Sequence, residues 1–184
     1  MNYEDYKNAR DKTWRLILDL GISELPIRPG AICKKLGIAV RFGDLPPDND
    51  GISFFAGDKP VIVVSKGVPL PRQRFTAAHE LGHIILGHVG EYELVNREPT
   101  SSDNPIEQAA NVFASRLLAP ACVLWGCGVT SPEQIARLCD ISMKAAQFRA
   151  DRMTVLYQRN KFLVSPLERE VYKQFSEYIK THRL

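Results

Sequence analysis

Residues 71–87 read PRQRFTAAHELGHIILG, and this stretch determines most of what the sequence predicts. Its apolar side chains recur at the spacing of an amphipathic helix, and the glycine at position 87 is a typical helix stop. Inside this helix lie His79 and His83, in the pattern H-E-x-x-H. Because an α-helix has about 3.6 residues per turn, the two imidazoles share a face and can reach a single metal ion.

Glu80 stands beside the two histidines in this pattern. Zinc lowers the pKa of a bound water to about 7, and a neighbouring carboxylate can then take its proton. The alternative, a helix with two incidental histidines, has to account for three of the chain's four histidines falling within residues 79–88. The pattern therefore predicts a catalytic zinc site in which Glu80 need not be a ligand.

A catalytic zinc needs a third protein ligand. His88 is five residues past His83, which on a continuing helix would place it about 140° from the ligand face. We therefore expect His88 to be a surface histidine or one at the helix C-terminus, where the helix dipole favours it. The acidic candidates downstream are Glu91, Glu93, Glu98, Asp103 and Glu107.

Glu107 lies near the start of a second predicted helix, which begins at Asn104-Pro105 and ends at about Leu118. Asn111 follows one turn later on the same face, which suits a metal ligand and a partner that orients a histidine ring. The same residues also fit a capping box, in which Glu107 turns back onto the start of its own helix. On spacing alone, the two interpretations are even.

The remainder of the sequence predicts an α+β fold. An N-terminal helix precedes strand-like runs at residues 39–42, 52–55 and 61–64, and the last two are joined by a tight connection. Four consecutive β-branched residues at 61–64 indicate a strand buried on both faces. We therefore expect an exposed edge, where an extended substrate could bind by β-augmentation, at Ile52, Ser53, Phe54 and Phe55. Further helices are predicted to begin at Pro132 and Pro166.

Composition narrows the class of protein. The 184 residues carry a formal charge of +3, too little to indicate nucleic-acid binding. No uncharged run reaches the roughly 20 apolar residues of a membrane span, and the N-terminus lacks the apolar core of a signal peptide. The four cysteines form no C-x-x-C pair, so we expect a cytoplasmic protein with reduced thiols. We expect Cys122 and Cys127, near Trp125, to be small buried side chains rather than metal ligands.

Residues 134–153 read QIARLCDISMKAAQFRADRM, which predicts a helix-turn-helix with its break at residues 140–142. Residues 131–161 hold six Lys or Arg against three Asp or Glu, a net charge of +3. That charge is modest, and several apolar side chains suit packing against the rest of the protein: Ile135, Leu138, Phe148 and Met153. We therefore favour a structural or partner-docking role and expect no direct DNA binding.

Two blocks of the sequence resemble the ImmA/IrrE family of bacterial metallopeptidases. The first is HELGHIILGH at residues 79–88, preceded by Arg74-Phe75-Thr76. The second is the pattern E-x-x-A-N-x-F-A-x-x-L-L-x-P at residues 107–120. With the preceding strands, the resemblance covers about residues 50–120.

This resemblance implies zinc ligands at His79, His83 and Glu107 and a general base at Glu80. It also implies that Asn111 contacts a ligand without binding the metal itself. Manganese could replace zinc, because nitrogen and oxygen ligands accept both metals. The implied fold is a zincin-like metallopeptidase domain with a small antiparallel sheet. We place it at residues 1–125, followed by a helical, helix-turn-helix-like region packed on it at 126–184.

The resemblance also implies an intracellular endopeptidase that cleaves a helix-turn-helix repressor and so derepresses stress or mobile-element genes. Two other functions remain open: a DNA-binding regulator with a structural metal site, and a module that sequesters the repressor without hydrolysis. The presence of Glu80 argues against the sequestering module, because a purely structural metal site has no use for a general base. The DNA-binding regulator would instead show duplex binding that depends strongly on salt.

Overall fold

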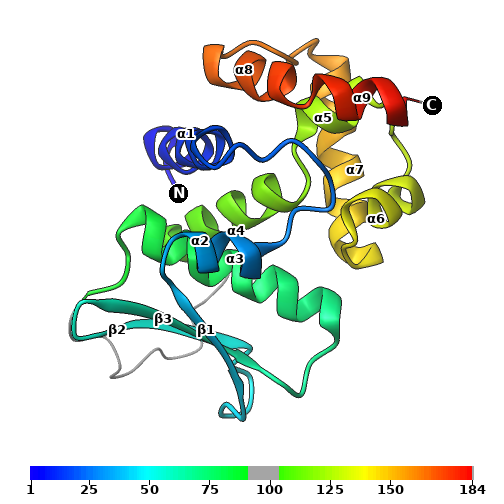
Figure 1. The fold of residues 1–184 in the computed structure, drawn as a ribbon. Coiled ribbons are helices and arrows are strands. Elements are labelled where there is room, and N and C mark those ends of the chain that lie inside the picture. Colours follow the sequence, from blue (N-terminus) through cyan, green and yellow to red (C-terminus); the bar gives the residue numbers. More distant parts are fainter. Residues whose placement is uncertain (91–103, 184) are drawn as a thin grey trace. The chain divides into compact units, whose positions relative to one another are not determined.

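The computed structural model describes residues 1–90 and 104–183 (Figure 1). The loop predicted at residues 93–104 therefore lies outside the described residues, except for Asn104. The same holds for four of the acidic candidates: Glu91, Glu93, Glu98 and Asp103. The described chain forms two compact units, residues 1–12 with 28–114 and residues 13–27 with 115–184. The division at residue 125 that the sequence suggests stays a prediction.

The first unit contains a three-stranded sheet of β1 (Ala39–Gly43), β2 (Gly51–Ala56) and β3 (Lys59–Ser65), in the order β1-β3-β2. β2 and β3 form the predicted antiparallel hairpin, but β1 pairs with β3 in parallel, so the sheet is mixed rather than antiparallel. The reason is that the chain reverses twice. The turn at residues 44–50 reverses it once and the hairpin reverses it again, so β3 runs in the direction of β1.

β3 is the central strand, as its β-branched run predicts. Val61, Ile62 and Val64 are buried there. β2 lies at an edge of the sheet, and within the described ranges no strand pairs with its outer side. The expectation that residues 52–55 form an edge strand is therefore confirmed.

Helices α2 (Pro29–Lys35) and α3 (Leu70–Leu86) pack beside this sheet, α2 against β1 and α3 against β2 and β3 (Figure 1). α3 carries the H-E-x-x-H pattern and ends where predicted, because Gly87 adopts a left-handed conformation with φ of 80°. α4 (Pro105–Leu118) matches the second predicted helix. Its first ten residues belong to the same unit as α3.

The second unit is helical. It contains the later part of α1 (Tyr3–Asp19), the end of α4, and five further helices: α5 (Ala121–Gly126), α6 (Pro132–Cys139), α7 (Met143–Gln158), α8 (Pro166–Gln174) and α9 (Ser176–His182). The helix-turn-helix is confirmed, with α6 ending at Asp140 in a left-handed conformation and Ser142 capping α7. Cys122 and Cys127 are buried free thiols, as expected, and so are Cys33 and Cys139. Burial raises the pKa of Cys33 to about 11.

Phe148 corrects one expectation. Ile135 and Met153 are buried, but the side chain of Phe148 is 65% exposed and packs in no core. The buried face of α7 consists of Ala146, Arg149, Ala150 and Met153. Phe148 lies two residues from Ala146 and from Ala150, so at about 100° per residue it points to nearly the opposite side of the helix.

The stretch Pro105–Gly126 is long and apolar enough by composition to cross a membrane, although the sequence suggested no such segment. However, 72% of its most apolar window is buried inside the protein. The stretch is interrupted between α4 and α5 by Pro120. It therefore has the properties of core helices.

Candidate metal centre

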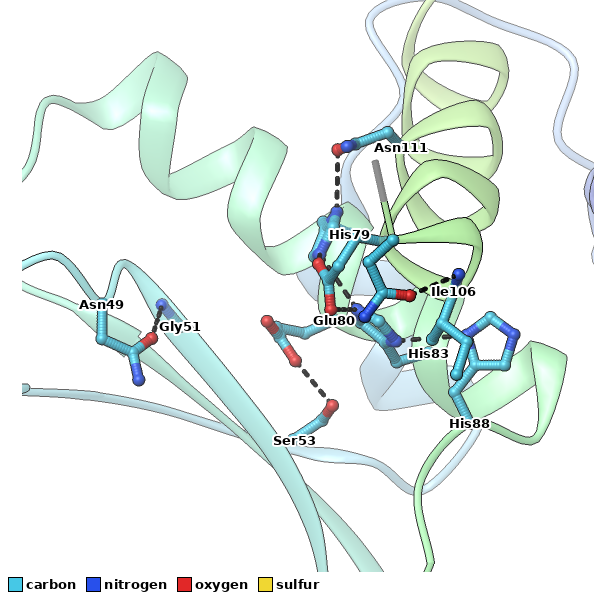
Figure 2. Close-up of polar contacts among 11 residues, drawn as sticks. Asn49, Gly51, Ser53, His79, Glu80, His83, His88, Ile106 and Asn111 are labelled. Carbon is cyan, nitrogen blue, oxygen red and sulfur yellow. Dashed lines mark hydrogen bonds and ion pairs between the residues drawn. The ribbon is translucent and has the colours of Figure 1, made fainter. Parts of the chain in front are cut away.

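Three side chains from two helices converge at one point (Figure 2). His79 and His83 come from α3, with their Nε2 atoms 3.0 Å apart. Glu107 comes from the first turn of α4, with Oε2 3.0 Å from His79 Nε2 and Oε1 3.4 Å from His83 Nε2. In the described part of the chain, this is the one group of three or more His, Cys, Asp or Glu that could hold a metal ion.

The spacing of these donor atoms fits zinc. Zinc binds imidazole nitrogen at about 2.0–2.1 Å in tetrahedral geometry, which places neighbouring ligand atoms about 3.3 Å apart. The observed separations of 3.0 to 3.4 Å match that value. Two imidazoles and one carboxylate would supply three ligands, which is the number that a catalytic zinc site takes from the protein.

Glu107 faces the imidazoles and not its own helix. Hydrogen bonds from His79 and His83 hold the pKa of its carboxyl well below the usual range, so it is ionised at neutral pH. The start of α4 is capped instead by Asn104, whose Oδ1 accepts a hydrogen bond from the Ile106 amide at 2.9 Å. The sequence allows Glu107 to act either as a metal ligand or as part of a capping box. The geometry supports the metal ligand, because the carboxylate faces His79 and His83.

Asn111 orients the ring of His79. Its Oδ1 lies 3.0 Å from His79 Nδ1 (Figure 2). A carbonyl oxygen only accepts hydrogen bonds, so with a metal bound this contact would keep the ring proton on Nδ1 and leave Nε2 to bind the metal. The structure thus brings Asn111 to the position that the spacing on α4 suggested.

His88 lies just past the C-terminus of α3, yet its ring reaches back to the site. Its Nδ1 is 3.2 Å from His83 Nδ1. On a continuing helix His88 would point away from the ligand face, but Gly87 turns the chain, and the His88 amide donates a hydrogen bond to the His83 carbonyl at 2.9 Å. His88 is therefore not one of the three residues that could hold a metal ion, but it contacts His83 at the ring nitrogen that faces away from His79 and Glu107.

Glu80 lies beside these donors and is only 3% exposed. Its Oε2 accepts a hydrogen bond of 2.6 Å from the hydroxyl of Ser53 on β2 (Figure 2). Ser53 is also one of the residues expected to bind substrate through the edge of β2, which stays a prediction, and its side chain points inward to Glu80. A signal for this existed, since Ser53 is the polar residue within an otherwise apolar run at 52–55.

Gly82 allows α3 and α4 to come close enough to share the site. A Cβ at this position would lie 3.0 to 3.3 Å from three atoms of the Phe113 side chain, which is fully buried. We expect Gly82→Ala to destabilise the protein by about 1–3 kcal/mol through overpacking, and to weaken zinc binding by shifting Glu107 away from the histidines. Chemical denaturation and a zinc titration of the variant would measure both effects. Unchanged values would show that this close approach is not needed.

Comparison with known proteins agrees with this geometry. A family model described as the IrrE N-terminal-like domain, peptidase family M78, matches residues 33–151. That range includes the sheet and every residue of the site described above. No curated protein matches the chain. Because the match covers more than half of its residues, the chain belongs to the IrrE N-terminal-like family of peptidases and has a metallopeptidase-type function.

Proposed function

We propose that this protein is a zinc-dependent endopeptidase, with His79, His83 and Glu107 as ligands and Glu80 as general base. The observation that carries the proposal is the convergence of the three donor atoms beside a buried carboxylate. Membership of a peptidase family supports it. A structural metal site would explain the three donors but would leave Glu80 without a role.

When bound, zinc would supply Lewis-acid polarisation of the scissile carbonyl and a water of lowered pKa. Glu80 accepts the proton of the attacking water and then donates it to the leaving amine. Asn111 holds the His79 ring so that Nε2 faces the metal position. Manganese could take the same place, because the donors are nitrogen and oxygen atoms.

The substrate that we propose is an extended segment of a regulatory protein. Within the described residues the outer edge of β2 is unpaired, and an extended peptide can add to such an edge by backbone hydrogen bonds. Ile52, Phe54 and Phe55 would then lie along the bound segment. The resemblance to ImmA/IrrE proteins supports a helix-turn-helix repressor as the substrate, cleaved in the cytoplasm to derepress stress or mobile-element genes.

The test is an incubation of the zinc-loaded protein with the helix-turn-helix repressor encoded beside its gene, followed by intact-mass spectrometry. We expect two products whose masses sum to that of the repressor plus one water. The same incubation with Glu80→Ala should leave the repressor intact. Repressor that stays whole but remains bound would instead support the sequestering function, and cutting by both proteins would refute the role of Glu80 as general base.

We expect no direct DNA binding, although the helix-turn-helix is present. One of the six basic residues at 131–161, Arg149, is only 6% exposed, so five remain accessible against three acidic ones. Fluorescence anisotropy with duplex DNA at two salt concentrations should show a Kd of about 10⁻⁴ M or weaker. Micromolar binding that weakens steeply with salt would support the DNA-binding alternative.

A further inference from the structure

The hydroxyl of Ser53 and the carboxylate of Glu80 form a buried pair. Ser53 is 5% exposed and Glu80 is 3% exposed, and 2.6 Å separates Ser53 Oγ from Glu80 Oε2. The two residues come from different elements, β2 and α3, and are 27 positions apart in the chain. A hydrogen bond to an ionised carboxylate is shorter and stronger than one between neutral groups.

We propose that Ser53 is a positioning residue for the reaction, which fixes the carboxylate of Glu80 in the orientation that a general base needs. This inference rests on the proposed peptidase function. The Ser53 hydroxyl has one proton to donate and gives it to Oε2.

A second residue of β2 holds the same side chain. A Cβ at Gly51 would lie 3.2 Å from Glu80 Cγ and would clash with the methyl group of Thr76. The backbone amide of Gly51 is held by Asn49 Oδ1 at 3.2 Å (Figure 2). Because residues two apart on a strand share a face, Gly51 and Ser53 both face Glu80, one at the methylene and one at the carboxylate.

The consequence is that β2 has two tasks. Its inner face fixes Glu80, and its outer edge is where we propose that the substrate backbone binds. The same strand would therefore set the position of the general base relative to the scissile bond. Small errors in such geometry lower the catalytic rate without weakening substrate binding.

The experiment compares wild type, Ser53→Ala, Ser53→Thr and Ser65→Ala, with the repressor as substrate and cleavage followed by intact mass. Ser65 is a matched control on the neighbouring strand β3, and its hydroxyl accepts a hydrogen bond from the Gly67 amide. We expect Ser53→Ala to lower kcat by about 10- to 100-fold, the usual effect of losing a partner that orients a functional group. KM and zinc affinity should stay close to wild type, and the melting temperature should fall only by the loss of one hydrogen bond to a buried carboxylate. Ser53→Thr, which keeps the hydroxyl, should recover most of kcat, and Ser65→Ala should match wild type.

Two results would overturn the proposal. A Ser53→Ala variant with wild-type kcat would show that the hydroxyl is not needed. Parallel losses of kcat, zinc affinity and stability without recovery in Ser53→Thr would show a structural role only. If the wild-type protein itself fails to cleave, the proposed function is refuted, and the inference with it. This result differs from the two above because it does not depend on the residue at position 53.

Discussion

Replacement of Glu80 by glutamine is expected to lower kcat for cleavage by about 10²- to 10⁴-fold, the range for loss of a general base. Glutamine has nearly the same shape as glutamate, and its side-chain oxygen can still accept the hydrogen bond from Ser53. It cannot take a proton from water at neutral pH. The measurement is single-turnover cleavage by the zinc-loaded variant beside wild type.

Zinc content is the control for this variant. Glu80 is not one of the three converging donors, so Glu80→Gln should bind one zinc with wild-type affinity. Equal zinc content with lost cleavage assigns Glu80 to proton transfer. A variant that still cleaves at the wild-type rate would refute this role, and one that loses zinc would indicate that Glu80 is itself a ligand.

Replacement of Glu107 by alanine is expected to lower zinc affinity by more than about 100-fold. Loss of a residue that only orients a ligand costs about 10- to 100-fold, and loss of a ligand should cost more. The carboxylate is also the one negative charge among the three converging donors. Titration against a competing chelator would measure the change, with Asn111→Ala expected to lie within the smaller range.

Asn104→Ala separates this effect from helix capping. It removes the hydrogen bond to the Ile106 amide at the start of α4, which should cost about 1 kcal/mol of stability. Zinc affinity should remain near that of wild type, because Asn104 is not among the converging donors. If Glu107→Ala loses stability but binds zinc normally, as a cap variant would, then Glu107 is not a ligand.

The helices were the most predictable part of this protein. Local signals predict two helix ends at the site: Gly87 ends α3, and Asn104-Pro105 begins α4. The edge position of β2 was also predictable, because the β-branched run of β3 marks the central strand. The parallel pairing of β1 was not, since it depends on two successive chain reversals rather than on any single strand.

Within the site, the sequence did not predict contacts between residues of different secondary-structure elements. Spacing along α4 cannot tell which way the Glu107 carboxylate turns, because that depends on where α3 places its histidines. The contact of His88 with His83 depends on the turn at Gly87, which a helical extrapolation ignores. The contact of Ser53 with Glu80 joins a strand to a helix and needs the packing of β2 on α3.

The most direct test of the metal centre is X-ray absorption at the zinc edge of the zinc-loaded protein. We predict a first coordination shell of two imidazole nitrogens and carboxylate or water oxygens at about 2.0–2.2 Å, with four ligands in total. The four cysteines are buried free thiols outside the converging group, so no sulfur should be seen. Sulfur at about 2.3 Å, or a shell filled entirely by protein ligands, would contradict a catalytic centre formed by His79, His83 and Glu107.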